Sequence, residues 1–430
     1  MAARKVLRGA RWPGDIAVEH GLISKIGSIT PDPGDEVIAC DGAVITAGLV
    51  NTHHHLFQWL TRGGGDGCDL LSWLRKLYPI WVRISVEDVA AAATVGLAEL
   101  AMSGATTVAD HHYIVPHGDD SVFDAIALAA RKVGVRLHLS RGSMDVGESA
   151  GGLPPDDVVE GIDAILASTE AVTARLHDGD RVSVVIAPAS TLCVSPQLMV
   201  ESANLARKLG LRMHTHLAET IDMEQDCVDR FGRRSVDVLE ELGWIDNDVW
   251  FAHVIHLNAS EIVRLGAAGT GIAHCPSSNG RLGAGLCPVR DFLDAGAPVG
   301  LGVDGSASSE GGTLFPEIKM ALYFARLLSG PSAMSPTQAL ELATVGGARC
   351  LGRPDLGRLE VGAPADIAVW PADDIEDIED PIAGLVLGPT REVRHLLVGG
   401  DEVVIDGEVQ GIDLRAAHTE LARRARAFWD

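Results

Sequence analysis

One unit recurs along most of this chain and limits its possible folds more than any other feature. From about residue 44, a short apolar stretch rich in β-branched residues is followed by a polar loop and then by an Ala- and Leu-rich stretch with a period near 3.6. Alternating strands and helices predict a parallel sheet, and eight strands favour closure into a distorted (β/α)8 barrel, the TIM-barrel class of α/β folds. The eight apolar stretches are 44–52, 104–110, 135–140, 181–188, 212–218, 249–254, 269–275 and 299–304.

The two ends of the chain have a different pattern. Both contain short alternating stretches interrupted by Gly, Pro and Asp, with little helix-like sequence. They predict a small composite β-sandwich domain formed by residues 1–47 and 358–412 together. The barrel is then expected over residues 48–357, and a final amphipathic helix over residues 413–430.

Composition favours a soluble protein of a reducing compartment. Hydrophobic residues make up 47% of the 430 residues, yet no run approaches the ~20 apolar residues that span a membrane. The N-terminal segment lacks the apolar core of a signal peptide. The seven cysteines are scattered and form no CxxC pair, which argues against a disulfide framework. We therefore expect a cytoplasmic protein without a membrane partner.

The charge of the chain excludes one class of partner. Thirty-five Lys and Arg residues against 59 Asp and Glu residues give a formal net charge of −24. Such a field repels phosphate backbones, and no basic cluster interrupts it. Nucleic acid is therefore not an expected partner, and the absence of GxGxxG after the first strand argues against a dinucleotide-binding fold.

Polar residues gather where the predicted strands end, which is where a parallel barrel carries its reactive side chains. His53 and His55 follow the first stretch and are two residues apart, so they point to the same side of an extended chain. Imidazole nitrogens together with a carboxylate oxygen form a donor set that suits Zn²⁺. The polar residues at the other strand ends are His214, His216, Glu219, His253 and Asp304.

Several of these residues lie in motifs that resemble a known family. The motifs are GLVNTHHH (48–55), HTHLAE (214–219), AHVIH (252–256), HCPSSNGRL (274–282) and GLGVDGSAS (300–308). With them the chain resembles the amidohydrolase superfamily, in the branch of cytosine, guanine and S-adenosylhomocysteine deaminases and triazine hydrolases. The resemblance covers nearly the whole chain.

The resemblance implies roles for individual residues. The implied metal ligands are His53, His55, His216 and Asp304. Glu219 matches the proton-shuttling glutamate of the family, and His253 matches the histidine that assists the hydrolytic water, with Asp304 as the third catalytic residue. Binuclear relatives carry a lysine at the end of the fourth strand, but residues 184–190 contain none. The resemblance therefore implies one zinc ion per chain, with Fe²⁺ as an alternative.

A second set of residues is expected to contact the substrate. Gln58 offers a donor and an acceptor, Arg141 suits a ring carbonyl, and Tyr113 or Trp81 could stack on a flat heterocycle. Two of these have a plainer alternative, since Trp81 could be a core residue and Arg141 could pair with a carboxylate. The complete set of predicted substrate contacts is Gln58, Trp81, Tyr113, Arg141, Ser143 and Asn279.

Longer strings narrow the expected substrate. NTHHHLFQWLTR (51–62), HHYIVPHG (111–118) and SRGSMDVGESAGGLPPD (140–156) are especially similar to 8-oxoguanine deaminases, isoxanthopterin deaminases and hydroxydechloroatrazine ethylaminohydrolases. The implied partner is a small aminoheterocycle, and the implied reaction is hydrolytic deamination, with 8-oxoguanine converted to uric acid and ammonia. The alternatives are an isoxanthopterin- or guanine-type deaminase, a hydroxyatrazine C–N hydrolase, and a non-catalytic zinc-binding assembly protein. We also expect a homo-oligomer, since barrels with exposed helices often dimerise.

Overall fold

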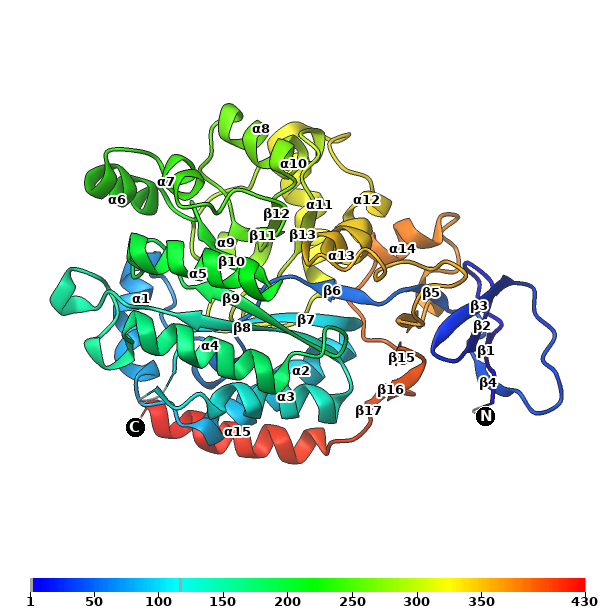
Figure 1. Cartoon of the computed structure of the whole chain (residues 1–430). Coiled ribbons are helices and arrows are strands. Elements are labelled where there is room, and N and C mark those ends of the chain that lie inside the picture. The colour runs from blue at the N-terminus through cyan, green and yellow to red at the C-terminus, as the bar shows by residue number, and fades with distance from the viewer. Residues whose placement is uncertain (1–2, 116–117, 430) are drawn as a thin grey trace.

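A closed barrel of eight parallel strands forms the centre of the computed structural model, which describes residues 3–115 and 118–429 (Figure 1). The strands follow one another around the barrel in chain order, and every neighbouring pair is parallel. They are β6 (Leu49–Asn51), β7 (Ala105–His112), β8 (Arg136–Ser143), β9 (Val182–Pro188), β10 (Arg212–Leu217), β11 (Val249–His253), β12 (Gly271–His274) and β13 (Val299–Leu301). The predicted (β/α)8 barrel is confirmed. Pro116 and His117, part of the motif HHYIVPHG, lie outside the described residues.

Helices cover the outside of the barrel and fill the connections between its strands. Many end at a glycine in the left-handed region, as at Gly134, Gly210 and Gly269. The helices that follow barrel strands are α1 (Leu70–Trp81), α2 (Val86–Met102), α3 (Ser121–Val133), α4 (Ile162–Leu176), α5 (Pro196–Leu209), α6 (Ile221–Phe231), α7 (Ser235–Glu241), α8 (Ala259–Ala268), α9 (Pro276–Arg281), α10 (Val289–Asp294), α11 (Phe315–Ser329), α12 (Pro336–Glu341) and α13 (Gly347–Cys350). A short 3-10 helix, η1 (Leu56–Thr61), precedes α1.

The predicted first strand, residues 44–52, is divided in two by the structure. Its first half is β5 (Val44–Ala47), which leaves the barrel and joins a separate sheet, and its second half is β6. The division falls at Gly48, where a Cβ atom would lie 2.2 Å from the Thr106 side chain. Only glycine lets the chain pass this close to β7 while it turns from one sheet into the other.

Two further sheets pack together beside the barrel (Figure 1). One has the order β3-β2-β1-β4, and the other the order β17-β16-β15-β14-β5, so β5 joins the N-terminal segment to strands near the C-terminus. Apolar residues of both sheets, such as Ile16 and Ile367, share one buried cluster. The strands are β1 (Lys5–Arg8), β2 (Asp15–Glu19), β3 (Leu22–Gly27), β4 (Glu36–Ala39), β14 (Ile367–Trp370), β15 (His395–Val398), β16 (Asp401–Ile405) and β17 (Glu408–Val409).

The last two helices pack against helices of the barrel. Helix α14 (Pro381–Leu387) lies between β14 and β15 in the sequence, and α15 (Leu414–Trp429) runs along α2 (Figure 1). His418 Nε2 and Glu99 Oε1 are 2.6 Å apart, and Arg424 Nη1 donates to Asp88 Oδ1 at 3.0 Å. Among the described residues, no helix has both the length and the apolar character that crossing a bilayer requires.

A buried ion pair connects the barrel to the composite sheet. Arg136 at the start of β8 donates to both carboxylate oxygens of Asp366, at 2.9 and 3.2 Å, and both side chains are buried. The main-chain N–H of Gly399 donates to the same carboxylate at 2.7 Å. Removing one partner of such a pair leaves a buried charge without compensation.

We predict that Asp366→Ala lowers the free energy of unfolding by about 3–5 kcal/mol, because the Arg136 guanidinium loses its buried carboxylate partner and keeps only the exposed Asp180. Urea denaturation followed by circular dichroism measures the change. Asp401→Ala is the matched control: it removes an exposed carboxylate 3.0 Å from Arg181 Nη2, and exposed pairs contribute only about 0–1 kcal/mol. Equal effects of the two substitutions would contradict the prediction.

Candidate active site

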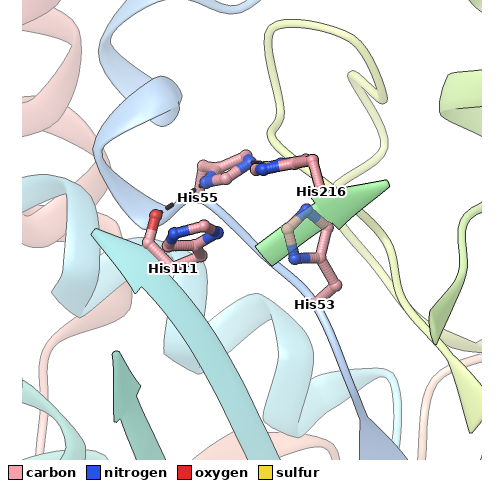
Figure 2. Close-up of side chains that lie close together, drawn as sticks. All are labelled: His53, His55, His111 and His216. Carbon is pink, nitrogen blue, oxygen red and sulfur yellow. Dashed lines mark hydrogen bonds between the residues drawn. The ribbon is translucent and has the colours of Figure 1, made fainter. Parts of the chain in front are cut away.

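Four polar residues from three barrel strands converge at the carboxyl end of the barrel. His53 and His55 follow β6, His216 lies on β10, and Asp304 follows β13. His55 Nε2 and His216 Nε2 are 3.2 Å apart, and Asp304 Oδ1 lies 3.3 Å from the Nε2 atoms of both His53 and His55. Figure 2 shows the three histidine rings gathered in one place. The structure thus brings together all four residues that the resemblance implies as metal ligands.

The other ring nitrogen of two of these histidines faces a main-chain carbonyl. His55 Nδ1 lies 2.7 Å from the oxygen of His111, and His216 Nδ1 lies 2.7 Å from the oxygen of Ala189. A carbonyl can only accept, so Nδ1 carries the hydrogen in both rings. In the neutral rings each Nε2 is then a bare lone pair, and the two lone pairs face each other at 3.2 Å. This contact is repulsive unless a cation lies between the two atoms.

The protonation state of these histidines also suits a bound cation. Burial lowers the pKa of His55 to about 3 and holds the pKa of His53 well below its usual value. Burial also lowers the pKa of His216. Neutral imidazoles are the form in which histidine binds metals.

The spacing of the donor atoms tests whether a metal fits. Zinc binds nitrogen and oxygen ligands at about 2.0–2.2 Å in a tetrahedron, which places neighbouring ligand atoms about 3.3–3.5 Å apart. The measured separations of 3.2, 3.3 and 3.3 Å among the nitrogen and carboxylate atoms are close to this edge length. His53 Nε2 is buried and has no hydrogen-bond partner among the described residues. The four residues therefore fit a zinc ion.

Two more ionisable residues stand beside this cluster. His253 Nε2 lies 3.6 Å from Glu219 Oε2 and 3.8 Å from Asp304 Oδ2. His253 Nδ1 faces the side-chain oxygen of Asn279 at 2.9 Å, so its Nδ1–H donates there and its Nε2 points to the carboxylates. Burial, together with the charge of Asp304, raises the pKa of Glu219 to about 8. A protonated carboxyl group at neutral pH can donate a proton to a substrate.

The backbone is strained at these positions. His253 has a φ of 71° and Asp304 a φ of 60°, although neither is a glycine. Residues held in the left-handed region cost about 1–3 kcal/mol each and cluster at functional sites. Here the conformation occurs where each strand ends and its side chain enters the cavity.

A cavity with about 490 Å³ of empty space, part of it open to solvent, lies over the cluster. Its floor contains the polar residues His55, His216, Glu219, His253, Asp304 and Ser308. One wall is apolar and comes largely from α1, through Leu70, Trp73, Leu74 and Tyr78. Its remaining lining includes Gln58, Tyr113, Ser190, Leu192 and Met223.

Two of the six predicted substrate contacts line this cavity, namely Gln58 and Tyr113. The structure does not bring the other four to its wall. Trp81 is fully buried in the core and donates to Thr61 Oγ1 at 3.0 Å, which is the plainer alternative for this residue. Ser143 is buried at the end of β8, and Asn279 contacts His253 instead.

Arg141 does not line the cavity either. Its guanidinium donates to both oxygens of Glu160, at 2.7 and 2.8 Å, and to the main-chain oxygen of Gly142. The side chain has no exposed surface. A guanidinium engaged in a bidentate pair is not free to bind a ring carbonyl, so the structure gives no support to Arg141 as a substrate contact.

Three residues near the site received no individual role from the sequence. His111 on β7 has one ring nitrogen within 4.8 Å of those of His53, His55 and His216 (Figure 2), and its position at a predicted strand end could have revealed it. His214 contacts His53 directly. Tyr78 enters the cavity from α1, and no motif in the sequence marks it.

Comparisons with known proteins agree with this geometry. The model of the Amidohydrolase family matches residues 44–403. The 8-oxoguanine deaminase of Pseudomonas aeruginosa is 45% identical over 413 residues, which cover 94% of this chain and 92% of that protein. The isoxanthopterin deaminase of an unknown prokaryotic organism is 38% identical, over 97% of this chain and 92% of that protein.

A solved structure extends the comparison to the fold. The zinc complex of atrazine chlorohydrolase from Arthrobacter aurescens TC1 has a TM-score of 0.92 and 30% identity, and the match covers 98% of this chain and 100% of that one. The family model, the relatives and the barrel all agree. The chain belongs to the amidohydrolase family and is a hydrolase.

Proposed function

We propose that this protein is a zinc-dependent deaminase of small aminoheterocycles, with one zinc ion per chain and 8-oxoguanine as its preferred substrate. The observation that carries the proposal is the position of Glu219, a buried acid 3.6 Å from His253, on the same cavity as the histidine cluster. Metal retention requires neither residue, so their presence favours an enzyme over a zinc-binding assembly protein. The 45% identity to an 8-oxoguanine deaminase supports the substrate.

The zinc ligands in this proposal are His53, His55, His216 and Asp304. When bound, zinc would lower the pKa of a water molecule in the cavity to about 7 and so supply hydroxide near neutral pH. The end of β9 offers no lysine to bridge a second metal, which supports a single ion.

The chain's own residues then carry the protons. Glu219, protonated at neutral pH, donates to a ring nitrogen and makes the adjacent amino-bearing carbon electrophilic. His253 Nε2 accepts the proton of the attacking water, held in place by its Nδ1–H bond to Asn279. Water adds to this carbon as its second proton goes to His253. The Glu219 carboxylate then takes up the hydroxyl proton of the adduct and passes it to the amino group, so the C–N bond breaks and ammonia leaves. His253, 3.6 Å from Glu219, returns the water proton to it and restores both residues. The products are uric acid and ammonia.

Recognition of the ring falls to polar groups on the cavity wall. Gln58 Oε1 is buried and has no hydrogen-bond partner among the described residues. Among the same residues, the Tyr78 hydroxyl donates only to a weak acceptor, Met144 Sδ, at 3.8 Å. Tyr113 contributes a second hydroxyl and is the third polar residue of this wall. These groups can pair with the carbonyl and N–H edges of an oxygen-rich bicyclic ring.

The site also admits other substrates of the same chemistry. Isoxanthopterin and guanine present similar amino-bearing rings, and hydroxyatrazine would require cleavage of a substituted C–N bond.

The seven free cysteines support a reducing cytoplasm as the place of action. We expect the functional unit to be a homo-oligomer.

Metal content is the first test. Purified protein should contain about one zinc ion per chain, because the site offers three imidazoles and one carboxylate. His216→Ala should lose most of the metal. Elemental analysis by mass spectrometry measures both. A reproducible content of two metals, or a full complement in the variant, would refute the proposed ligand set.

Glu219→Gln should lower kcat by at least about 10²-fold, because the amide cannot donate and regain a proton, while the zinc content stays unchanged. Glu317→Gln is the matched control: burial raises the pKa of Glu317 to about 7, but this residue does not line the cavity. Steady-state release of ammonia measures turnover. An active Glu219→Gln variant would exclude the proton-shuttle role.

Substrate preference is tested by measuring kcat/KM for 8-oxoguanine, guanine, isoxanthopterin, cytosine and hydroxyatrazine with one preparation. We expect 8-oxoguanine to rank first. Tyr78→Phe should lower its kcat/KM about tenfold, the value of one neutral hydrogen bond. Guanine, which lacks the second carbonyl, should be affected less. If cytosine or hydroxyatrazine ranks first, the deaminase chemistry stands and the purine assignment is wrong.

A further inference from the structure

A second histidine stands behind one of the proposed zinc ligands. His53 Nδ1 lies 2.8 Å from His214 Nε2, and His214 Nδ1 lies 2.9 Å from the main-chain oxygen of Trp250. Both imidazoles are buried, with exposed fractions of 0% and 1%. The result is a chain of two hydrogen bonds that leads from the backbone of β11 through His214 to His53.

The direction of these hydrogen bonds follows from the carbonyl. The Trp250 oxygen can only accept, so His214 Nδ1 carries a hydrogen. Burial disfavours a charged ring, so His214 is neutral and its Nε2 is a bare acceptor. His53 Nδ1 must then be the donor, and His53 Nε2 is left as a lone pair directed toward Asp304 Oδ1 at 3.3 Å. One carbonyl therefore sets the tautomer of both rings.

His53 differs in this respect from the other two proposed histidine ligands. His55 and His216 donate their Nδ1–H groups directly to main-chain carbonyls. His53 depends instead on a side chain. If its ring turned over, carbon atoms would replace nitrogens on both sides, and its lone pair would leave the cluster. Its orientation can thus be changed by one substitution that leaves the main chain in place.

Packing holds His214 itself in position. Its ring stacks on the indole of Trp250, with centroids 4.5 Å apart and an angle of 14° between the planes. The Trp250 Nε1–H donates to the main-chain oxygen of Thr52, next to His53, at 3.1 Å. Trp250 therefore fixes both His214 and the backbone that carries the ligand.

We propose that His214 is a positioning residue for the metal: it holds His53 in the tautomer and orientation in which Nε2 binds zinc. This inference rests on the proposed zinc site. Outer partners of ligating histidines raise metal affinity by about 10–100-fold. Sequence motifs imply only His216 of the HTHLAE string as a ligand, and the structure assigns a separate task to the first histidine of that string.

The test uses zinc affinity of the full-length protein, measured by competition with a chromogenic chelator. His214→Leu removes the acceptor and should weaken zinc binding by about 10–100-fold. His214→Gln places an amide oxygen near the position of Nε2 and should recover most of the affinity. His138→Leu is the matched control, since His138 is a buried histidine of β8 that does not belong to the cluster.

A second readout separates positioning from general damage. Co²⁺ bound in place of zinc has visible absorption bands that depend on the ligand nitrogens, and these bands should change in His214→Leu and return in His214→Gln. Thermal unfolding in the presence of a chelator checks that each metal-free variant is folded. If the leucine variant does not fold, the glutamine variant decides the test, because the proposal requires His214→Gln to have near-normal zinc affinity and near-normal cobalt absorption bands.

Three results would overturn the inference. Normal affinity and an unchanged cobalt spectrum in His214→Leu would show that His53 needs no partner, while the zinc site would stand. Equal losses in the leucine, glutamine and control variants would show a structural role only. A wild-type protein that binds no zinc would overturn the proposed function together with this inference.

Discussion

The convergence of uncompensated lone pairs is the constraint on which the rest of the site depends. His53, His55 and His216 direct bare nitrogens, and Asp304 an oxygen, into one buried space with separations of 3.2 and 3.3 Å. Without a cation these atoms repel one another in a medium of low dielectric constant. The barrel can hold them together because main-chain carbonyls on or next to its strands accept hydrogen bonds from the opposite edge of each ring, directly or through His214. The rigid closed sheet thus opposes the repulsion.

A second layer of residues holds the groups that face the substrate. Ser278 donates to Asp304 Oδ2 at 2.6 Å, and its neighbour Asn279 binds His253. Both come from the motif HCPSSNGRL at the end of β12, and they support the site without lining the cavity, which this motif reaches through Leu282. The positive φ angles of His253 and Asp304 are tolerated because these hydrogen bonds hold the side chains after each turn.

Sequence patterns predict the site residues best where the position of a side chain follows from the alternation along a strand. Alternation on an extended chain correctly places His53 beside His55, and the order of strands brings His216 and Asp304 to the same rim. The same alternation puts His214 on the side of His216, but spacing cannot tell a ligand from its partner. The sequence could not assign the roles of Arg141 and Trp81, because tertiary packing determines that their hydrogen-bond partners are Glu160 and Thr61. Tyr78 could not be identified as a cavity residue for the same reason, because the face of α1 that lines the cavity depends on how this helix packs on the barrel.

The two halves of the site have different structural origins, and this bears on substrate choice. The metal-binding half is built from barrel strands and their main-chain carbonyls, which the family shares as a fold. The recognition half comes largely from α1 and from the loop after β9, through Tyr78, Trp73, Ser190 and Leu192. These segments can change without disturbing the lone pairs beneath them. The proteins that this chain resembles are named for 8-oxoguanine, isoxanthopterin and atrazine. Under the proposed function, specificity in this chain is a property of the wall, and the hydrolytic chemistry is a property of the barrel.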